Sequence, residues 1–185
     1  MEFSALEKSL LSMLKERPIS VATESAKFTY KLTGISRAIT HQIVRHRKMA
    51  FGQQSLRVSN PAYDPIRLPV ELVKSGDEYL IGKAKDTLSN NKDLYFELVK
   101  KGVPPEQARN VLPIGITTKI SVTLTLRDLI DYLHARTSGI AQDEHTYVAL
   151  MMANEMKNKQ PKFYNFISTK VEKLEDLLKT YGFNN

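Results

Sequence analysis

The sequence of 185 residues contains no cysteine. That absence excludes disulfide bonds, thiolate metal sites and thiol nucleophiles. Long apolar runs are also missing, and the first residues, Met1–Lys8, lack the apolar block of a signal peptide. We therefore expect a soluble, cytoplasmic protein with no membrane partner.

Several motifs that mark common function classes are absent as well. The chain has no Gly-rich phosphate loop of the Walker or dinucleotide type, no zinc-finger spacing and no aromatic-rich RNA-binding signature. Its four histidines lack the clustered spacing of a metal site, so we predict no bound metal.

The formal net charge of +7 suits either phosphate-bearing ligands or a nucleic-acid surface. The basic residues are spread along the chain and interleaved with acids, especially in 170–179, which argues against a dedicated basic arm. We expect no specific nucleic-acid partner. The chain of 185 residues has the length of a single domain, 1–185, and its 42% hydrophobic residues are enough to form a core.

One short segment concentrates basic side chains. An Arg-His-Arg triplet at 45–47 is followed after seven residues by Ser55 and then Arg57. Guanidinium forks can each hold a phosphate by two hydrogen bonds, and the serine adds a neutral donor. A solvated helix end is the simpler alternative for the triplet. However, 48–58 contains no acid that could pair with the arginines, which favours an anion-binding site.

Two segments alternate apolar and polar residues and predict strands over 27–33 and 117–125. In the first of these, Phe28, Tyr30 and Leu32 are expected to face the core.

Apolar residues at helical spacing predict most of the remaining structure. A helix over 34–44 carries Ile35, Ile39 and Ile43 on its buried face and is ended by the basic triplet. Further helices are expected from Ser4 to Pro18, over 70–102 with a break near Ser89–Asn91, from Pro104 to Arg109, over 126–136, over 142–159 and over 161–181. Three prolines within 59–69 predict an irregular connection.

The helix over 126–136 contains two arginines that stand out. Arg127 and Asp131 are one turn apart, so a salt bridge between them is the simplest expectation. Arg136 has no acid four residues to either side and precedes Gly139, where the helix should stop. A solvated arginine and a ligand-binding one both remain open for Arg136.

Together these motifs resemble the flavin-dependent thymidylate synthases. The family's long signature is similar to 34–58, through Gly34-Ile35-Ser36-Arg37-Ala38, His41-Gln42, Arg45-His46-Arg47 and Ser55. A second family stretch resembles Arg109, Val111-Leu112-Pro113, 123–127, Leu133-His134-Ala135-Arg136 and Ala141-Gln142. The resemblance covers roughly residues 20 to 160.

The resemblance implies an α+β fold, helix-rich, in which a small twisted antiparallel sheet is flanked by helices and 70–102 forms a helical insertion. It also implies a homotetramer with active sites between subunits. The implied reaction is reductive methylation of dUMP to dTMP, using reduced FAD, methylenetetrahydrofolate and NADPH. A chain without cysteine fits this family, because the unrelated thymidylate synthases attack the uracil ring with a cysteine.

The resemblance also implies residue roles. Arg136 would be the catalytic residue, favouring ionisation of the uracil ring and stabilising its negative charge. The nucleotide would be bound by Gln42, Gln53, Ser55, Arg57, Arg109 and Arg136. The flavin would be bound by Arg45, His46, Arg47, Gln53, Thr125, Arg127 and Asp131.

The chain departs from the family pattern at several positions, most of them on the flavin side. The departures are Ile19, Ala50, Gln53, Val58, Thr125, Asp131 and Ile140, and the family's additional N-terminal strand would precede Met1. Two alternatives therefore stay open beside the main reading. One is a related flavin-dependent modification of another pyrimidine nucleotide, and the other is a non-catalytic nucleotide- or nucleic-acid-binding relative.

Overall fold

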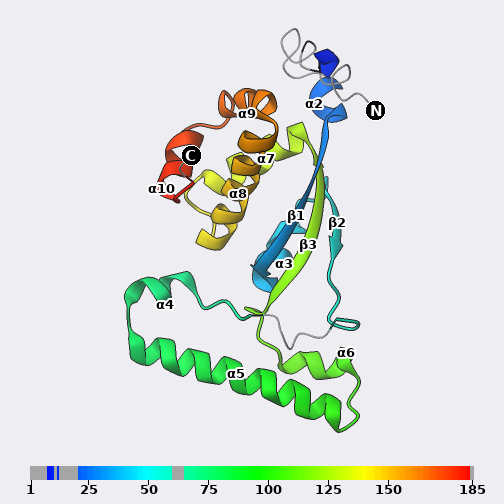
Figure 1. Ribbon diagram of the computed structural model, residues 1–185, viewed down its shortest axis with the longest axis vertical. Helices are drawn as coiled ribbons and strands as arrows, with labels where there is room; N and C mark the ends of the chain where they lie inside the picture. The colour runs from blue at the N-terminus through cyan, green and yellow to red at the C-terminus, as the bar shows by residue number, and fades with distance from the viewer. Residues whose placement is uncertain (1–7, 11, 13–20, 60–64, 184–185) are drawn as a thin grey trace. The chain divides into compact units, whose positions relative to one another are not determined.

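The computed structural model of the chain describes residues 8–10, 12, 21–59 and 65–183. It has the predicted α+β fold, with helices joined to a small antiparallel sheet (Figure 1). The helix expected between Ser4 and Pro18 falls mostly outside the described residues, although 8–10 and 12 are helical. Ile19 also lies outside them.

The sheet consists of β1 (Lys27–Ser36), β2 (Ala50–Gln53) and β3 (Thr117–Thr125), in the order β1-β3-β2. The alternation that predicted β1 and β3 is confirmed: in β3, for example, Ile120, Val122 and Leu124 are buried between more exposed neighbours. β2 was not predicted, because its four residues have no buried side chain and thus no alternation to detect.

The chain divides into two compact units. The first combines the chain up to Tyr30 with His46–Ala50 and Val122–Asn185, and the second combines Lys31–Arg45 with Phe51–Ser121. β1 and β3 each contribute residues to both units.

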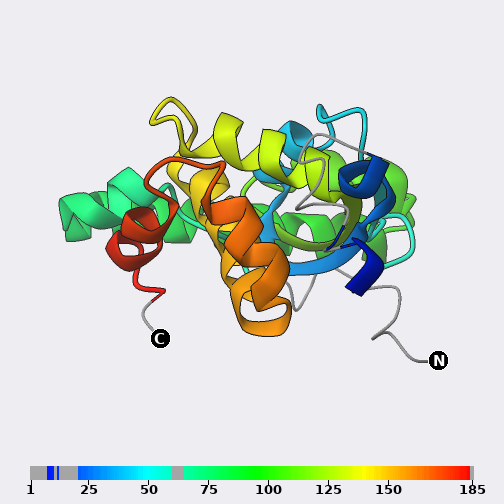
Figure 2. The same ribbon diagram turned by 90° about the horizontal axis from the view of Figure 1, so that it is seen from above.

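The first unit is mainly helical. Its helices are α2 (Val21–Ser25), α7 (Leu126–Thr137), α8 (Asp143–Lys159), α9 (Pro161–Ser168) and α10 (Leu174–Thr180). α7 packs on α8 and α8 on α9, as both views show (Figures 1 and 2). Their apolar stripes form a core that includes Leu129, Leu133, Met152 and Ile167.

The single helix expected over 161–181 is wrong, because the chain turns between α9 and α10. Lys173 adopts a left-handed backbone conformation with φ of 56°, which an α-helix cannot continue through. The turn also buries Val171 and directs Leu174 and Leu178 into the core. Tyr164 then donates a hydrogen bond of 2.7 Å to Glu175, which ties α9 to α10.

The second unit contains α3 (Arg37–Ile43), α4 (Val70–Ser75), α5 (Glu78–Lys100), α6 (Pro105–Ala108) and the short 3₁₀ helix η2 (Arg109–Val111). α3 starts at Arg37 rather than Gly34, because Ser36 caps it by accepting a hydrogen bond from the Ile39 backbone at 3.2 Å. It ends at Ile43, so the basic triplet follows the helix in a turn.

The break expected near Ser89–Asn91 is also wrong, since α5 runs through these residues without interruption. Serine and asparagine each cost only about 0.5 kcal/mol in a helix interior, which a long helix tolerates. In the irregular connection over 59–69, the described part includes an isolated bridge between Ile66 and Ile116. None of the helices in the described residues has the length and apolarity needed to cross a membrane.

Candidate functional site

Two histidines, a tyrosine and an arginine meet in the first unit. Arg136, in the last turn of α7, lies against His46 in the turn after α3, with Nη2 2.8 Å and Nε 3.3 Å from His46 Nε2. The ring centroid of His46 lies 4.9 Å from that of Tyr132 and 6.4 Å from that of His145. We call these four residues the Arg136 cluster.

Burial controls the charges of the Arg136 cluster. Burial and the nearby Arg136 lower the pKa of His46. The pKa of His145 is lowered to about 3, most strongly by burial and to a lesser extent by Arg136 and His46. Burial also raises the pKa of the Tyr132 hydroxyl. Both histidines and the tyrosine are therefore neutral near pH 7, and Arg136 carries the charge of the cluster.

The Tyr132 hydroxyl is a buried polar group of the Arg136 cluster. Tyr132 is 1% exposed, and its hydroxyl has no hydrogen-bond partner among the described residues. Leaving a buried hydroxyl unpaired is costly, so such groups often mark sites of function. Thr146 donates to the backbone oxygen of Arg136 at 2.8 Å, which joins the start of α8 to the end of α7.

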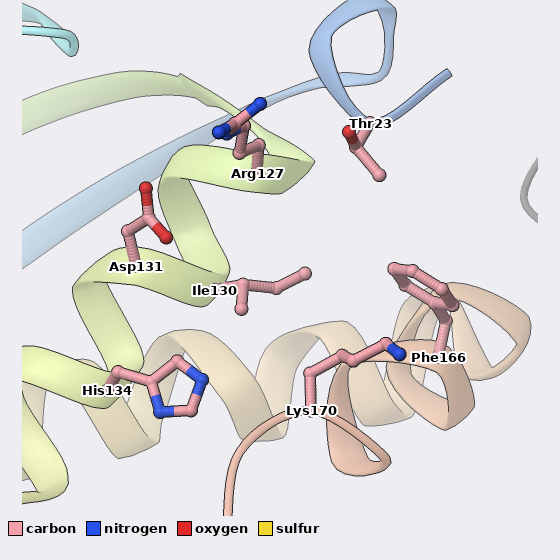
Figure 3. A pocket seen from close by; sticks show the side chains of 7 residues that line it. All are labelled: Thr23, Arg127, Ile130, Asp131, His134, Phe166 and Lys170. Atoms are coloured by element: carbon pink, nitrogen blue, oxygen red, sulfur yellow. The ribbon is translucent and has the colours of Figure 1, made fainter. Parts of the chain in front are cut away.

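A pocket of about 270 Å³ opens on another face of α7 (Figure 3). It contains Arg127 and Asp131, two of the predicted flavin-binding residues. Its lining comprises Thr23, Arg127, Ile130, Asp131, His134, Phe166 and Lys170. The Lys170 ammonium lies 5.6 Å from the centre of the Phe166 ring, so the pocket combines an aromatic surface with positive charge.

The salt bridge expected between Arg127 and Asp131 is wrong. Arg127 Nη1 instead pairs with Glu24 of α2, at 3.1 Å from Oε1. Both side chains are substantially exposed, so the pair contributes little to stability. Asp131 is exposed on α7.

Thr125, another predicted flavin-binding residue, caps α7. Its hydroxyl accepts a hydrogen bond from the Asp128 backbone at 3.1 Å and donates one to Asp128 Oδ2 at 2.7 Å. The Asp128 carboxylate also accepts from the Thr125 backbone at 3.4 Å, which completes a capping box.

The other predicted residues of the signature have local partners or face solvent. In the second unit, Gln53 donates to the Thr40 hydroxyl at 3.0 Å, and the Ser55 hydroxyl accepts from the Arg57 backbone at 3.2 Å. The side chains of this predicted group that are exposed are Arg45, Arg47, Gln53, Ser55 and Arg57, whereas Gln42 is half-buried. The exposed guanidiniums remain accessible to an anionic ligand.

Arg109 begins η2 in the second unit. It is exposed, and its Nε donates to the Glu106 backbone oxygen at 3.1 Å. This bond is local to one turn and leaves the rest of the guanidinium directed to solvent.

Tyr132 and His145 were not predicted as site residues. A signal for Tyr132 existed, because it stands four residues before Arg136 on the same helix and therefore shares its face. His145 gave no comparable signal, since a lone histidine in a helix is usually structural. No group of three or more metal-binding side chains occurs in the part of the chain that the structure describes.

Comparisons with known proteins agree with the resemblance. The family model of the thymidylate synthase complementing protein matches residues 4–162. The chain is 36% identical over 146 residues to the flavin-dependent thymidylate synthase of Sulfolobus acidocaldarius, covering 77% of this chain and 54% of that protein. Similar proteins with the same description occur in Sulfurisphaera tokodaii (37% over 147 residues; 78% and 55%) and Geobacter sulfurreducens (37% over 141 residues; 76% and 61%). The chain spans little more than half the length of these curated relatives.

Proposed function

Because the chain belongs to the thymidylate synthase complementing protein family, we propose that it carries out flavin-dependent methylation of dUMP to dTMP. The observation that carries this proposal is the setting of Arg136. One edge of its guanidinium is held by His46, and its Nη1 makes no hydrogen bond within the described residues. Such a cation, surrounded by neutral groups, suits a ligand ring that becomes negatively charged.

In this proposal the nucleotide is recognised mainly by charge-assisted hydrogen bonds. Accessible guanidiniums hold a phosphate by two bonds each, and hydroxyl and carboxamide groups orient the sugar and base. The residues assigned to the nucleotide are Gln42, Gln53, Ser55, Arg57, Arg109 and Arg136. As the C5 carbon of the uracil ring becomes nucleophilic, Arg136 stabilises the negative charge of the ring.

The pocket on α7 fits part of a flavin dinucleotide. Phe166 offers a surface for an aromatic ring, and Lys170 and Arg127 offer charge for a diphosphate. A volume of about 270 Å³ takes only one part of FAD. The residues assigned to FAD remain Arg45, His46, Arg47, Gln53, Thr125, Arg127 and Asp131, and the bound flavin supplies the redox chemistry.

The remaining parts of the proposal follow the family. We assign NADPH as the reductant and methylenetetrahydrofolate as the one-carbon donor. We further propose that the chain acts as a single domain in a cytoplasmic homotetramer whose active sites lie between subunits. Sedimentation of the purified protein tests the tetramer.

Two measurements on the purified protein test the function. We expect oxidised-flavin absorption bands that NADPH bleaches, and stoichiometric, salt-sensitive binding of dUMP in calorimetry. Preference for UMP over dUMP would favour modification of another pyrimidine nucleotide. A colourless protein that gains no flavin signal with FAD and binds neither nucleotide would refute both enzymatic hypotheses. The hypothesis of a non-catalytic relative would then remain.

A further inference from the structure

The contact between Arg136 and His46 fixes the protonation state of the histidine. Both Nε and Nη2 of Arg136 approach the same atom, His46 Nε2, at 3.3 and 2.8 Å. A guanidinium has only donors, so Nε2 must accept. His46 is therefore a neutral imidazole with its proton on Nδ1.

Two buried rings hold this imidazole in place. The Tyr132 ring meets His46 edge-to-face at 82°, and the His145 ring meets it at 88°. Tyr132 and His145 are 1% and 0% exposed, so neither can move without disturbing the core. Tyr132 comes from α7 and His145 from α8, so the imidazole is supported from two helices.

We propose that His46, supported by Tyr132 and His145, is a positioning residue that orients the Arg136 guanidinium toward the anionic pyrimidine ring. This proposal rests on the proposed function, in which Arg136 stabilises the negative charge of the pyrimidine ring. Electrostatic stabilisation depends on donors that are already in place, whereas a free arginine side chain must be ordered at an entropic cost. His46 Nε2 accepts from Nε and Nη2 of Arg136, which leaves Nη1 for the ligand.

The same arrangement makes the orientation sensitive to acid. Protonation of His46 would remove the acceptor and place a second positive charge beside Arg136. Among the described residues, the groups that face His46 are Arg136 and Tyr132 from α7 and His145 from α8, and none of them is a carboxylate that would favour protonation. The structure thus gives Nε2 a partner other than the flavin, to which the resemblance assigned His46.

A double-mutant cycle tests the proposal in the holoenzyme. At saturating FAD, His46→Ala should lower turnover at least tenfold while dUMP affinity changes by less than threefold, in line with the ~10²-fold cost of misplacing a catalytic group. In an Arg136→Ala background, His46→Ala should have almost no further effect. A full additional loss of turnover in that background would overturn the proposal.

His46→Gln provides the conservative control. Its amide oxygen can accept from Arg136 and does not titrate. The variant should therefore restore most of the turnover, and the loss of turnover at acidic pH that protonation of His46 causes should disappear. Failure of His46→Gln to exceed His46→Ala in turnover would count against a positioning role.

Nitrogen NMR of isotopically labelled protein gives a readout that does not depend on activity. We expect the His46 tautomer with its proton on Nδ1, and an Arg136 Nε–H signal that exchanges slowly in the wild type and rapidly in His46→Ala. A proton on Nε2 at neutral pH would refute the arrangement. Failure of the wild type to bind dUMP would instead refute the proposed function, and the NMR signals would still decide whether His46 holds Arg136.

Discussion

Arg136 is the side chain on which the proposed chemistry depends most. It is half-buried in the last turn of α7, and its side-chain hydrogen bonds go to a neutral imidazole. Since no carboxylate pairs with it in the described part of the chain, its positive field is not cancelled locally. Partial burial strengthens that field relative to water, so Arg136 can act on a charge that develops beside it.

We expect Arg136→Ala to reduce methyl transfer by about 10²-fold or more while leaving the flavin bound. An interaction made mainly in the transition state affects turnover more than ground-state affinity. Arg45→Ala should instead weaken flavin retention, and Lys48→Ala serves as an exposed control that should change neither property. Flavin occupancy and dUMP-dependent oxidation of the reduced flavin measure both effects. Wild-type turnover of Arg136→Ala, or unchanged flavin affinity of Arg45→Ala, would show that the two roles are wrongly assigned.

His145 makes stability depend on pH. Its pKa is lowered from 6.5 to about 3 by burial, then by Arg136 and His46. Below pH 6.5 the unfolded chain therefore binds a proton that the folded protein refuses. The free energy of unfolding should fall as pH drops from 6.5 toward 3, by about 1.4 kcal/mol per pH unit at most.

Urea denaturation at a series of pH values measures this dependence. His145→Gln cannot titrate, so its free energy of unfolding should fall less steeply over the same pH range than that of the wild type. Parallel pH dependences for the two proteins would contradict the assignment. The comparison isolates His145, because the other titrating groups are common to both proteins.

Among the elements, α7 supplies both parts of the candidate site. Arg127 and Asp131 stand one turn apart and line the pocket, while Tyr132 and Arg136 stand one turn apart and meet His46. Residues four apart share a face of a helix, so the pocket and the Arg136 cluster lie on two different faces of α7. The start of α7 therefore influences both the pocket and the Arg136 cluster, because the residue at which the helix begins sets the direction of every side chain along it.

Thr125→Ala should remove the capping box of α7 and lower the free energy of unfolding by about 1 kcal/mol. Thr125→Ser keeps the hydroxyl that bonds to Asp128 and should lose much less. Chemical denaturation measures both variants. If Thr125→Ala unfolds at the wild-type midpoint but releases flavin, then Thr125 serves the cofactor rather than the helix.

At the scale of the whole molecule, the charge of +7 is distributed over both units rather than gathered in one arm. Several cations are engaged in ion pairs, such as Lys157 with Glu175 at 3.1 Å and Lys74 with Glu71 at 2.9 Å. Such a distribution suits small anionic ligands better than a long polyanion.

We therefore expect only non-specific affinity for DNA, with a dissociation constant of about 10⁻⁴–10⁻⁶ M at physiological salt. Fluorescence anisotropy with random-sequence duplexes, repeated at several salt concentrations, measures it. Tight binding at physiological salt, together with no response to mononucleotides, would refute the enzymatic proposal and support a nucleic-acid-binding protein.

The sequence by itself determined the main elements and their buried faces. Alternation identified β1 and β3, and helical spacing identified α3, α7 and α8, because burial within one element depends on residues only a few positions apart. The signature and the residues around Arg136 also pointed to the family that the comparisons show. Local patterns failed where no side chain is buried, as in β2, or where a buried turn interrupts a helical pattern, as between α9 and α10.

Only the tertiary structure decided which side chains of the candidate site meet. His46 and Arg136 are 90 positions apart, and Glu24 and Arg127 are 103 apart, so no periodicity links either pair. The structure replaced the expected Arg127–Asp131 bridge with a pair to α2, and it added Tyr132 and His145 to the surroundings of Arg136. These contacts depend on how the chain returns on itself, and packing decides that across the whole fold rather than within a segment.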